Sequence, residues 1–357
     1  MKTYTKFLIM GFIKSLTYTT LVLFGLIIIL NVLGELEFFK NINVKTYFPL
    51  YLATLNTPSF IFEMFPFIFL LSTQVFFFNI LENNQIQIFK YSGLKNSQII
   101  KIISLSTFFI SILLITLFYN MSSNLKSFYL ELKLKYTIDG KYLAVITNNG
   151  LWIKDVVDGN INIINSSKIN DNHLIDSFIT QFDENYNVIQ NIKTEKINIK
   201  ENNWKIYKPT ILKNNNKEKV DILEIYSNFN YEKIKSLFSN LTSLSLYKLI
   251  QLKKNYDSLN YSSVDVSIQI QKLVSYPIFL TLMTILASII MYNTRAFKSN
   301  TLKLVFGLFF SVLIYYINNF FNVLGNTEKL TVSSSIWIPL ILLGIINIFF
   351  MRRINEK

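Results

Sequence analysis

Side chains that usually carry out catalysis are scarce in this sequence and do not form groups. His173 is the single histidine and cysteine is absent, so one copy of the chain cannot build a histidine relay, a multi-histidine metal site or a thiolate cluster. We interpret His173 as a surface residue. The adjacent carboxylates Asp183 and Glu184 fall in a predicted turn, where exposure to water explains them better than acid–base chemistry. The sequence therefore predicts neither catalytic residues nor a metal site.

A nucleotide-binding loop is also missing from the pattern. The motif GxxxxGK[ST] binds phosphate through backbone N–H groups and its lysine. Gly140-Lys141 is the only Gly-Lys pair, no glycine stands five residues before Gly140, and Tyr142 follows the lysine. We therefore expect this chain to hold no cofactor and to hydrolyse no ATP itself.

Long apolar runs dominate the rest of the chain. Hydrophobic residues make up 51% of it and charged residues 16%, a balance beyond that of ordinary soluble domains. A membrane-spanning helix needs about 20 mostly apolar residues. Six runs meet or approach this length, at residues 7–33, 58–81, 99–120, 267–292, 301–324 and 334–351. The pattern predicts an α+β membrane protein with six transmembrane helices, three on each side of a polar insert.

Basic residues predict the orientation of these spans. The formal net charge is +13, yet lysines and arginines cluster beside the spans, as the positive-inside rule requires, rather than on a surface for nucleic acid. The clusters are Lys2, Lys6 and Lys14; Lys90, Lys95 and Lys101; Arg295, Lys298 and Lys303; and Arg352, Arg353 and Lys357. We expect both termini in the cytoplasm, the insert outside it, and no nucleic-acid partner.

The insert has the pattern of an antiparallel β domain. Asn148-Asn149-Gly150 is typical of a hairpin turn between Tyr142–Thr147 and a strand that begins Leu151-Trp152-Ile153. Alternating segments recur about every 8–12 residues, the spacing of a sandwich or jelly roll. Further strands are expected near Ile161, Ile175–Phe182, Val188–Ile199, Trp204–Leu212 and Val220–Phe229. The predicted parts are transmembrane helices at 1–125, a jelly-roll-like domain at 130–230, a helical connector at 231–266 and transmembrane helices at 267–357.

Glu63 is an ionisable residue inside the second span, near its predicted outer end. Such a side chain either faces a cavity or partner, or reaches interfacial water, and we favour the second interpretation. Pro66 would kink or loosen the helix just beyond it. No other ionisable side chain is expected at this depth, which argues against a membrane enzyme.

Residues 82–98, between the second and third spans, predict a short amphipathic helix. Ile86 and Phe89 share one helical face, continued by Gly93 and Leu94 a turn later. Such a helix either lies on the membrane or docks into another protein, and its period favours neither. Gly93 either ends the helix with a positive φ or allows a partner to approach closely.

Four short segments add to this organisation. They are Phe65-Pro66-Phe67, Asn83–Gly93, Gly150-Leu151-Trp152-Ile153-Lys154-Asp155 and Tyr276-Pro277. With the order of three spans, a β domain and three spans, they resemble the LptF/LptG family, the permeases of lipopolysaccharide-export ABC transporters. The similarity is closer to the LptG branch and covers nearly the whole chain.

The resemblance implies a non-catalytic transport subunit in the inner membrane of a Gram-negative bacterium, with the β domain in the periplasm. Implied partners are a cytoplasmic LptB-like ATPase dimer, an LptF-like second permease, an LptC/LptA-like jelly-roll bridge and lipopolysaccharide. The implied ATPase-coupling residues are Glu82, Gln85, Ile86, Phe89, Lys90 and Gly93. The implied lipid-path candidates are Asn31, Lys40, Lys45, Glu63, Trp152 and Asn318. Motif positions with an implied structural role are Pro66, Gly150, Trp152, Asp155 and Pro277.

Several positions differ from the family pattern. Gln85 stands where members commonly carry glutamate, and Lys90 where they carry arginine or another polar residue. Asn31 aligns with a lysine of some LptG proteins, and Asn318-Asn319 replaces a more acidic pair. Docking of the ATPase is therefore expected to depend less on charge.

Three functions remain open at this point. A lipid-exporting permease, with spans 1 and 5 as lateral gates, predicts an apolar groove in the β domain. A mechanotransmitting permease, which relays ATPase motion without moving lipid, predicts a filled β core. A membrane enzyme predicts a cluster of ionisable residues at one depth. We favour them in that order.

Overall fold

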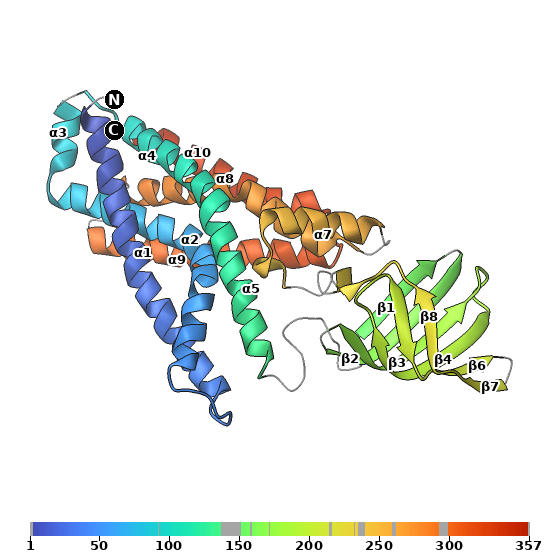
Figure 1. The fold of residues 1–357 in the computed structure, drawn as a ribbon. Coiled ribbons are helices and arrows are strands. Elements are labelled where there is room, and N and C mark those ends of the chain that lie inside the picture. Colours follow the sequence, from blue (N-terminus) through green and yellow to red (C-terminus); the bar gives the residue numbers. More distant parts are fainter. Residues whose placement is uncertain are drawn as a thin grey trace. The chain divides into compact units, whose positions relative to one another are not determined.

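The computed structural model describes residues 3–91, 93–136, 151–157, 159–170, 172–213, 216–231, 233–234, 240–258, 262–292 and 299–355. The chain forms two compact units (Figure 1). The first contains Met1–Ser127, Ser245–Ile250 and Ser263–Lys357, and the second contains Phe128–Leu244 and Gln251–Ser262. The first unit is helical, and the second is built mainly on a β-sheet.

Six helices among the described residues are long and apolar enough to cross a membrane. They are α1 (Thr3–Phe38), α2 (Phe48–Glu82), the continuous α4 (Asn96–Leu113), η1 (Leu114–Tyr119) and α5 (Asn120–Leu134), α8 (Val264–Tyr292), α9 (Asn300–Asn326) and α10 (Val332–Asn355). The short α3 (Gln85–Tyr91) joins α2 to α4. Each long helix contains one predicted apolar run and extends beyond it, because helices continue through polar end turns. The predicted membrane-protein class is confirmed.

Helices α2 and α8 form the centre of the first unit. They are the most buried of the six, whereas α1 and α9 are the least buried. Leu70 of α2, Met283 and Ala287 of α8, Ile314 of α9 and Leu343 of α10 meet in one apolar cluster. Helices α1 and α9 therefore present long apolar faces, suited to lipid or to another chain.

Pro66 does not end α2, which runs through it. A proline has no N–H, so the carbonyl four residues earlier, that of Phe62, loses its helical donor. The Tyr276 hydroxyl of α8 donates to this carbonyl, and the Tyr276 ring stacks on Phe62 with centroids 4.7 Å apart. Two of the sequence segments, Phe65-Pro66-Phe67 and Tyr276-Pro277, are thus one packing unit, in which α8 satisfies the acceptor that Pro66 frees.

The described residues of the second unit form one antiparallel sheet of eight strands. They are β1 (Leu151–Val157), β2 (Asn160–Asn170), β3 (His173–Phe182), β4 (Val188–Asn198), β5 (Asn203–Tyr207), β6 (Thr210–Lys213), β7 (Asn216–Lys219) and β8 (Ile222–Tyr226). The order is β1-β2-β3-β4-β5-β8, with β6 paired to β4 and β7 to β6. After the sheet come η2 (Leu241–Ser243) and α7 (Leu246–Ser258). The inserted β domain is confirmed, and its sheet fits a jelly-roll-like fold.

One detail of the predicted strands differs from the structure, and one predicted strand is not described by it. Trp204–Leu212 is two strands, β5 and β6, rather than one, because Lys208 has a φ of 45° before Pro209 and the ladder cannot continue through this pair. The predicted strand Tyr142–Thr147 and its turn Asn148-Asn149-Gly150 lie outside the described residues.

The inner face of the sheet is a filled core among the described residues. Side chains alternate between buried and exposed along β1 and β5, as the strand period requires. Trp204 is 1% exposed and donates through Nε1 to the Phe229 carbonyl at 2.7 Å. The other buried apolar residues of the strands include Leu151, Ile153, Ile164, Leu174, Ile179, Ile192, Ile197 and Ile206.

The predicted turn at Asp183-Glu184 is present between β3 and β4. Asp183 accepts hydrogen bonds from the Asn187 side chain and from the backbone N–H groups of Asn187 and Asn185. These bonds, chiefly that from the Asn187 side chain, hold the pKa of Asp183 below its usual value. The carboxylate therefore has a structural role in the turn, as its solvated position predicts.

Candidate functional site

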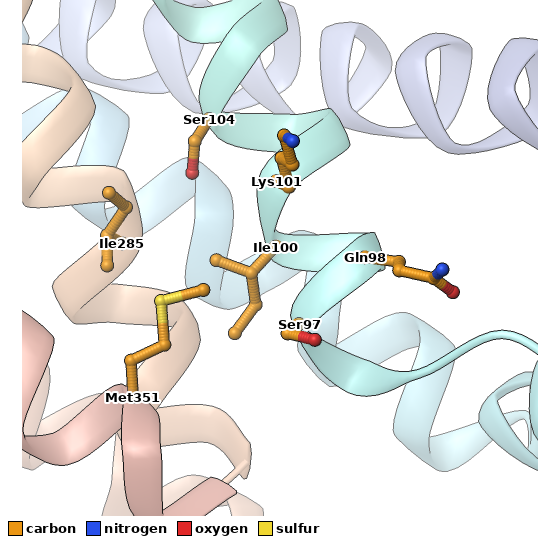
Figure 2. Close-up of a pocket in the computed structure, with 7 residues that line it drawn as sticks. All are labelled: Ser97, Gln98, Ile100, Lys101, Ser104, Ile285 and Met351. Atoms are coloured by element: carbon orange, nitrogen blue, oxygen red, sulfur yellow. The ribbon is translucent and has the colours of Figure 1, made fainter. Parts of the chain in front are cut away.

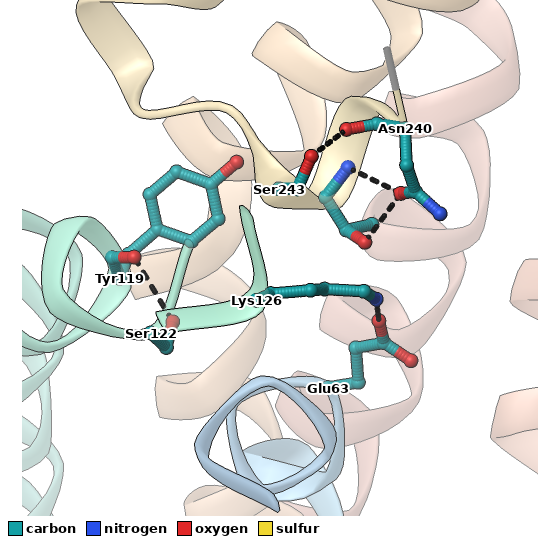
Figure 3. Close-up of polar contacts among 7 residues, drawn as sticks. Glu63, Tyr119, Ser122, Lys126, Asn240 and Ser243 are labelled. Atoms are coloured by element: carbon teal, nitrogen blue, oxygen red, sulfur yellow. Dashed lines mark hydrogen bonds and ion pairs between the residues drawn. The ribbon is translucent and has the colours of Figure 1, made fainter. Parts of the chain in front are cut away.

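A charged side chain of α2 lies opposite one of α5 in the first unit, and Figure 3 shows this pair, Glu63 and Lys126. Nζ of Lys126, on α5, is 4.0 Å from Oε1 of Glu63, on α2. The Lys126 side chain is 13% exposed and that of Glu63 is 52% exposed. An ion pair with one half-exposed partner stabilises a fold by at most about 1 kcal/mol. Stability therefore does not explain why a nearly buried lysine stands here.

A second lysine is affected by the same carboxylate. Lys272 of α8 is partly buried, and the charge of Glu63 acts on both Lys126 and Lys272. The carboxylate of Asp265, in the first turn of α8, also acts on Lys272. We call Glu63, Lys126 and Lys272 the charge cluster. Its two ammonium groups would bind an anionic group that competes with Glu63 for them.

A π-helical segment in the third span determines how the side chains near this cluster are oriented. The third span changes from α-helix to π-helix over Leu114–Tyr119 and back to α-helix at Asn120. Such segments shift the register of the side chains that follow and are frequent at functional sites. Tyr119, at its end, is 2% exposed and forms a hydrogen bond with the Gln269 side chain of α8. The segment thus sets the side of the helix from which Lys126 projects.

The sequence analysis missed this cluster and expected Glu63 to be alone at its depth. The apolar run of the third span ends near residue 120, whereas the helix continues to Leu134 and carries Lys126 with it. Extending the predicted helix beyond the end of the apolar run would have included Lys126 in the third span. Its proximity to Glu63, and that of Lys272, depends on tertiary packing.

The short helix α3 lies at the end of the first unit where both chain termini lie (Figure 1), here called the α3 end. Its apolar face is buried in the chain itself: Ile86 and Phe89 are each 8% exposed, and the Phe89 ring lies 5.9 Å from Phe7 of α1. Within this chain, the apolar face of α3 therefore packs against α1. The exposed side carries Ile88 and Tyr91, which are 62% and 89% exposed.

The ends of this segment are also defined. Gly93 has a φ of 78°, and the N–H of Leu94 donates to the Phe89 carbonyl at 3.0 Å, the pattern of a helix C-terminus closed by glycine. Of the two interpretations of Gly93, the structure shows the first. Glu82 ends α2, Gln85 begins α3 and Lys90 lies within it.

The other lipid-path candidates are not brought to the charge cluster. Asn31 of α1 donates to Oγ1 of Thr57 on α2 at 3.1 Å, so it joins two helices. Lys40 and Lys45 are exposed after α1, and Nζ of Lys45 lies 5.9 Å from the centre of the Tyr47 ring. Asn318 is partly buried on α9.

In the second unit, Trp152 and Asp155 point to opposite faces of β1. Trp152 is 55% exposed, on the same sheet face as Phe178 two strands away. Asp155 is 2% exposed and accepts from the Ser227 hydroxyl at 2.7 Å and from Asn228 through its backbone N–H at 3.2 Å and its amide at 2.9 Å. Asp155 thus fastens the first described strand to the segment after the last.

Replacing Asp155 with alanine is expected to destabilise the second unit. The change leaves three donors without their buried acceptor, at a cost of about 3 kcal/mol in the free energy of unfolding. Thermal unfolding of the purified chain, followed by circular dichroism, measures it against the exposed carboxylate variant Glu201→Ala. Equal melting curves for the two variants would show that Asp155 does not fasten the sheet.

A pocket of about 290 Å³ opens between α4, α8 and α10 near the α3 end (Figure 2). Its apolar wall is formed by Ile100, Ile285 and Met351, and Ser97, Gln98, Lys101 and Ser104 also line it. The volume lies below the usual range for small-molecule sites. In the residues that the structure describes, no group of three or more metal-ligating side chains occurs.

The chain matches the model of the family "Lipopolysaccharide export system permease LptF/LptG" over residues 6–353. It is thus a multi-pass permease by fold and family. The chain belongs to the LptF/LptG family, permeases of the lipopolysaccharide-export transporter. The match does not separate the LptF branch from the LptG branch. No curated protein matches the sequence.

Proposed function

We propose that this chain is the permease subunit that takes lipopolysaccharide from the inner membrane and passes it to a periplasmic jelly-roll bridge, driven by a separate cytoplasmic ATPase. The charge cluster is the observation that carries this proposal beyond the family match. Lipopolysaccharide is an anionic lipid, and Lys126 and Lys272 are two ammonium groups that an acidic headgroup would bind in competition with Glu63. The cluster would bind an acidic headgroup while the acyl chains stay among apolar helices.

The orientation of the proposed subunit follows from its charge. Lys90, Lys95 and Lys101 lie on or beside α3 and the start of α4, and Arg352 lies at the end of α10. By the positive-inside rule this end faces the cytoplasm, which places the β insert in the periplasm of a Gram-negative bacterium. Arg295 and Lys298, which lie outside the described residues, add positive charge to the loop after the fourth span.

The ATPase would dock on the exposed side of α3. Ile88 and Tyr91 are the large apolar side chains there, while the buried Phe89 holds the helix against α1. The least buried spans, α1 and α9, would form the lateral gates and pack against an LptF-like second permease. Among the described strands, β1 and β8 end the main path of the sheet, and these edges would accept a strand of an LptC/LptA-like bridge.

The test is to identify the lipid at the charge cluster. A photo-crosslinking residue in place of Met64, next to Glu63 in sequence and 37% exposed, is expected to capture lipopolysaccharide from membranes that contain it. The same residue in place of Tyr18 of α1, 65% exposed, serves as the control for lipid that merely surrounds the protein. Phospholipid alone at both positions would contradict the proposal.

A mechanotransmitting permease is the second candidate, and the filled inner face of the β-sheet favours it. An exporter that threads acyl chains through the β domain needs an open apolar surface. In the second unit such a surface exists on the opposite face of the sheet, where Trp152, Val156, Phe178 and Val188 are each more than one-third exposed. Crosslinking of lipopolysaccharide from Phe178 would support export, and crosslinking from neither Phe178 nor Met64 would support mechanotransmission.

A further inference from the structure

A buried lysine connects two helices at the α3 end of the first unit. Lys303, near the start of α9, is 2% exposed. Its ammonium donates to the Met291 carbonyl at the end of α8, at 3.1 Å, and to Oδ1 of Asn300, also at 3.1 Å. Carbonyls in the last turn of a helix lack an intrahelical donor and lie at the negative end of the helix dipole. Lys303 therefore fastens the start of α9 to the end of α8.

The same group reaches the end of α2. Asn300 donates through Nδ2 to Oε1 of Glu82, the last residue of α2, at 2.8 Å. Glu82 is exposed, whereas Lys303 is buried, so the group runs from the surface at α3 into the interior. The buried ammonium of Lys303 donates to a carbonyl and to the Asn300 amide oxygen, and the Asn300 amide nitrogen donates to the Glu82 carboxylate.

A second contact between α2 and α9 lies deeper. Gln74 of α2 is fully buried and donates to the backbone carbonyl of Lys303 at 2.9 Å. A Cβ at Gly307 would lie 2.0 Å from Nε2 of Gln74, so glycine is required for this approach. Gln74 and Glu82 stand eight residues apart, or about 12 Å along a helix. Helix α2 therefore holds α9 at two points.

We propose that Glu82, Asn300 and Lys303 form a link that transmits movement of α3 to α9, with Asn300 and Lys303 as positioning residues for transport. The inference rests on the proposed function, in which an ATPase docks on α3. Glu82 stands three residues before α3 begins, so a displacement of α3 moves its carboxylate directly. Helix α9 is among the least buried of the six spans and can respond by shifting against lipid.

The first test measures coupling in the complex purified through this chain. The complex is placed in vesicles of phosphatidylethanolamine and phosphatidylglycerol with lipopolysaccharide, and lipopolysaccharide released is divided by ATP hydrolysed. Asn300→Ala and Lys303→Met are expected to lower this ratio about tenfold, equivalent to about 1.4 kcal/mol of lost coupling, while ATP is still hydrolysed.

The matched control is Asn83→Ala, because the Asn83 amide bonds to the Asn79 carbonyl of its own helix at 2.9 Å. A wild-type ratio in both Asn300→Ala and Lys303→Met would overturn the link and leave the proposed function intact. A wild-type complex that releases no lipopolysaccharide would instead refute the proposed function.

The second test observes α9 itself and does not depend on lipid release. The chain has no native cysteine, so Tyr316→Cys, at an α9 position that is 65% exposed, accepts a single spin label. Nucleotide is expected to change the label's mobility in the assembled complex, and Asn300→Ala is expected to abolish this change while nucleotide still binds. A response that persists in Asn300→Ala, or that is absent without the substitution, would overturn the link.

Discussion

Replacing Lys126 with glutamine is expected to lower lipopolysaccharide binding to the purified complex about tenfold, because one of two cations in the charge cluster is lost and a charge-assisted contact is worth about 1.5–3 kcal/mol. Replacing Glu63 with glutamine is expected to leave binding unchanged or to strengthen it, since the carboxylate that competes with an acidic headgroup for Lys126 is then removed. The measurement is the lipopolysaccharide that co-purifies with each variant, titrated with added lipid.

The opposite signs separate a binding role from a structural one. If the 4.0 Å pair of Glu63 and Lys126 served stability alone, both substitutions would lower the melting temperature and the bound lipid together. Lys14→Gln removes the same charge from an exposed position of α1 and controls for net charge. Parallel losses in Lys126→Gln and Glu63→Gln would contradict the assignment of the cluster to lipid.

Replacing Phe89 with aspartate is expected to release the ATPase without unfolding the spans. The substitution places a carboxylate in the buried contact with Phe7, at a cost of about 3–5 kcal/mol to the docking of α3. The helix α3 would then leave its position and remove the docking surface. Co-purification of the ATPase with the tagged chain measures the loss.

Two further variants locate the docking surface itself. Tyr91→Ala changes the exposed side of α3 and is expected to weaken ATPase binding without moving the helix. Phe89→Leu keeps an apolar side chain against Phe7 and is expected to retain binding. ATPase that co-purifies unaltered with Phe89→Asp would show that α3 is not the docking helix.

The arrangement of the six spans was predictable from the sequence because apolar length is a local property. Each of the predicted runs lies inside one helix. The helix ends were less predictable: α2 begins ten residues before its predicted run, because its first turns mix polar and apolar side chains. Most strands followed from alternation, and only the positive φ of Lys208, which no period reveals, divided a predicted strand in two.

The candidate site depended on contacts that the sequence does not display. Glu63, Lys126 and Lys272 are far apart in the chain and come together only through helix packing. Phe89 fits an amphipathic pattern equally well whether its face meets lipid, a partner or its own chain, and the structure shows the third. The link from Glu82 to Lys303 could not be predicted either. In the sequence Lys303 is one of several basic residues beside a span, whereas in the structure it is buried.

The central claim is that this chain moves lipopolysaccharide with energy from another polypeptide. The direct measurement is transfer of lipopolysaccharide from vesicles carrying the complex to a soluble jelly-roll acceptor, followed with ATP and with a non-hydrolysable analogue. The account predicts transfer that requires ATP hydrolysis and falls about tenfold in Lys126→Gln, in line with the loss of one charge-assisted contact. Equal transfer with and without hydrolysis, or hydrolysis with no lipid reaching the acceptor, would contradict it.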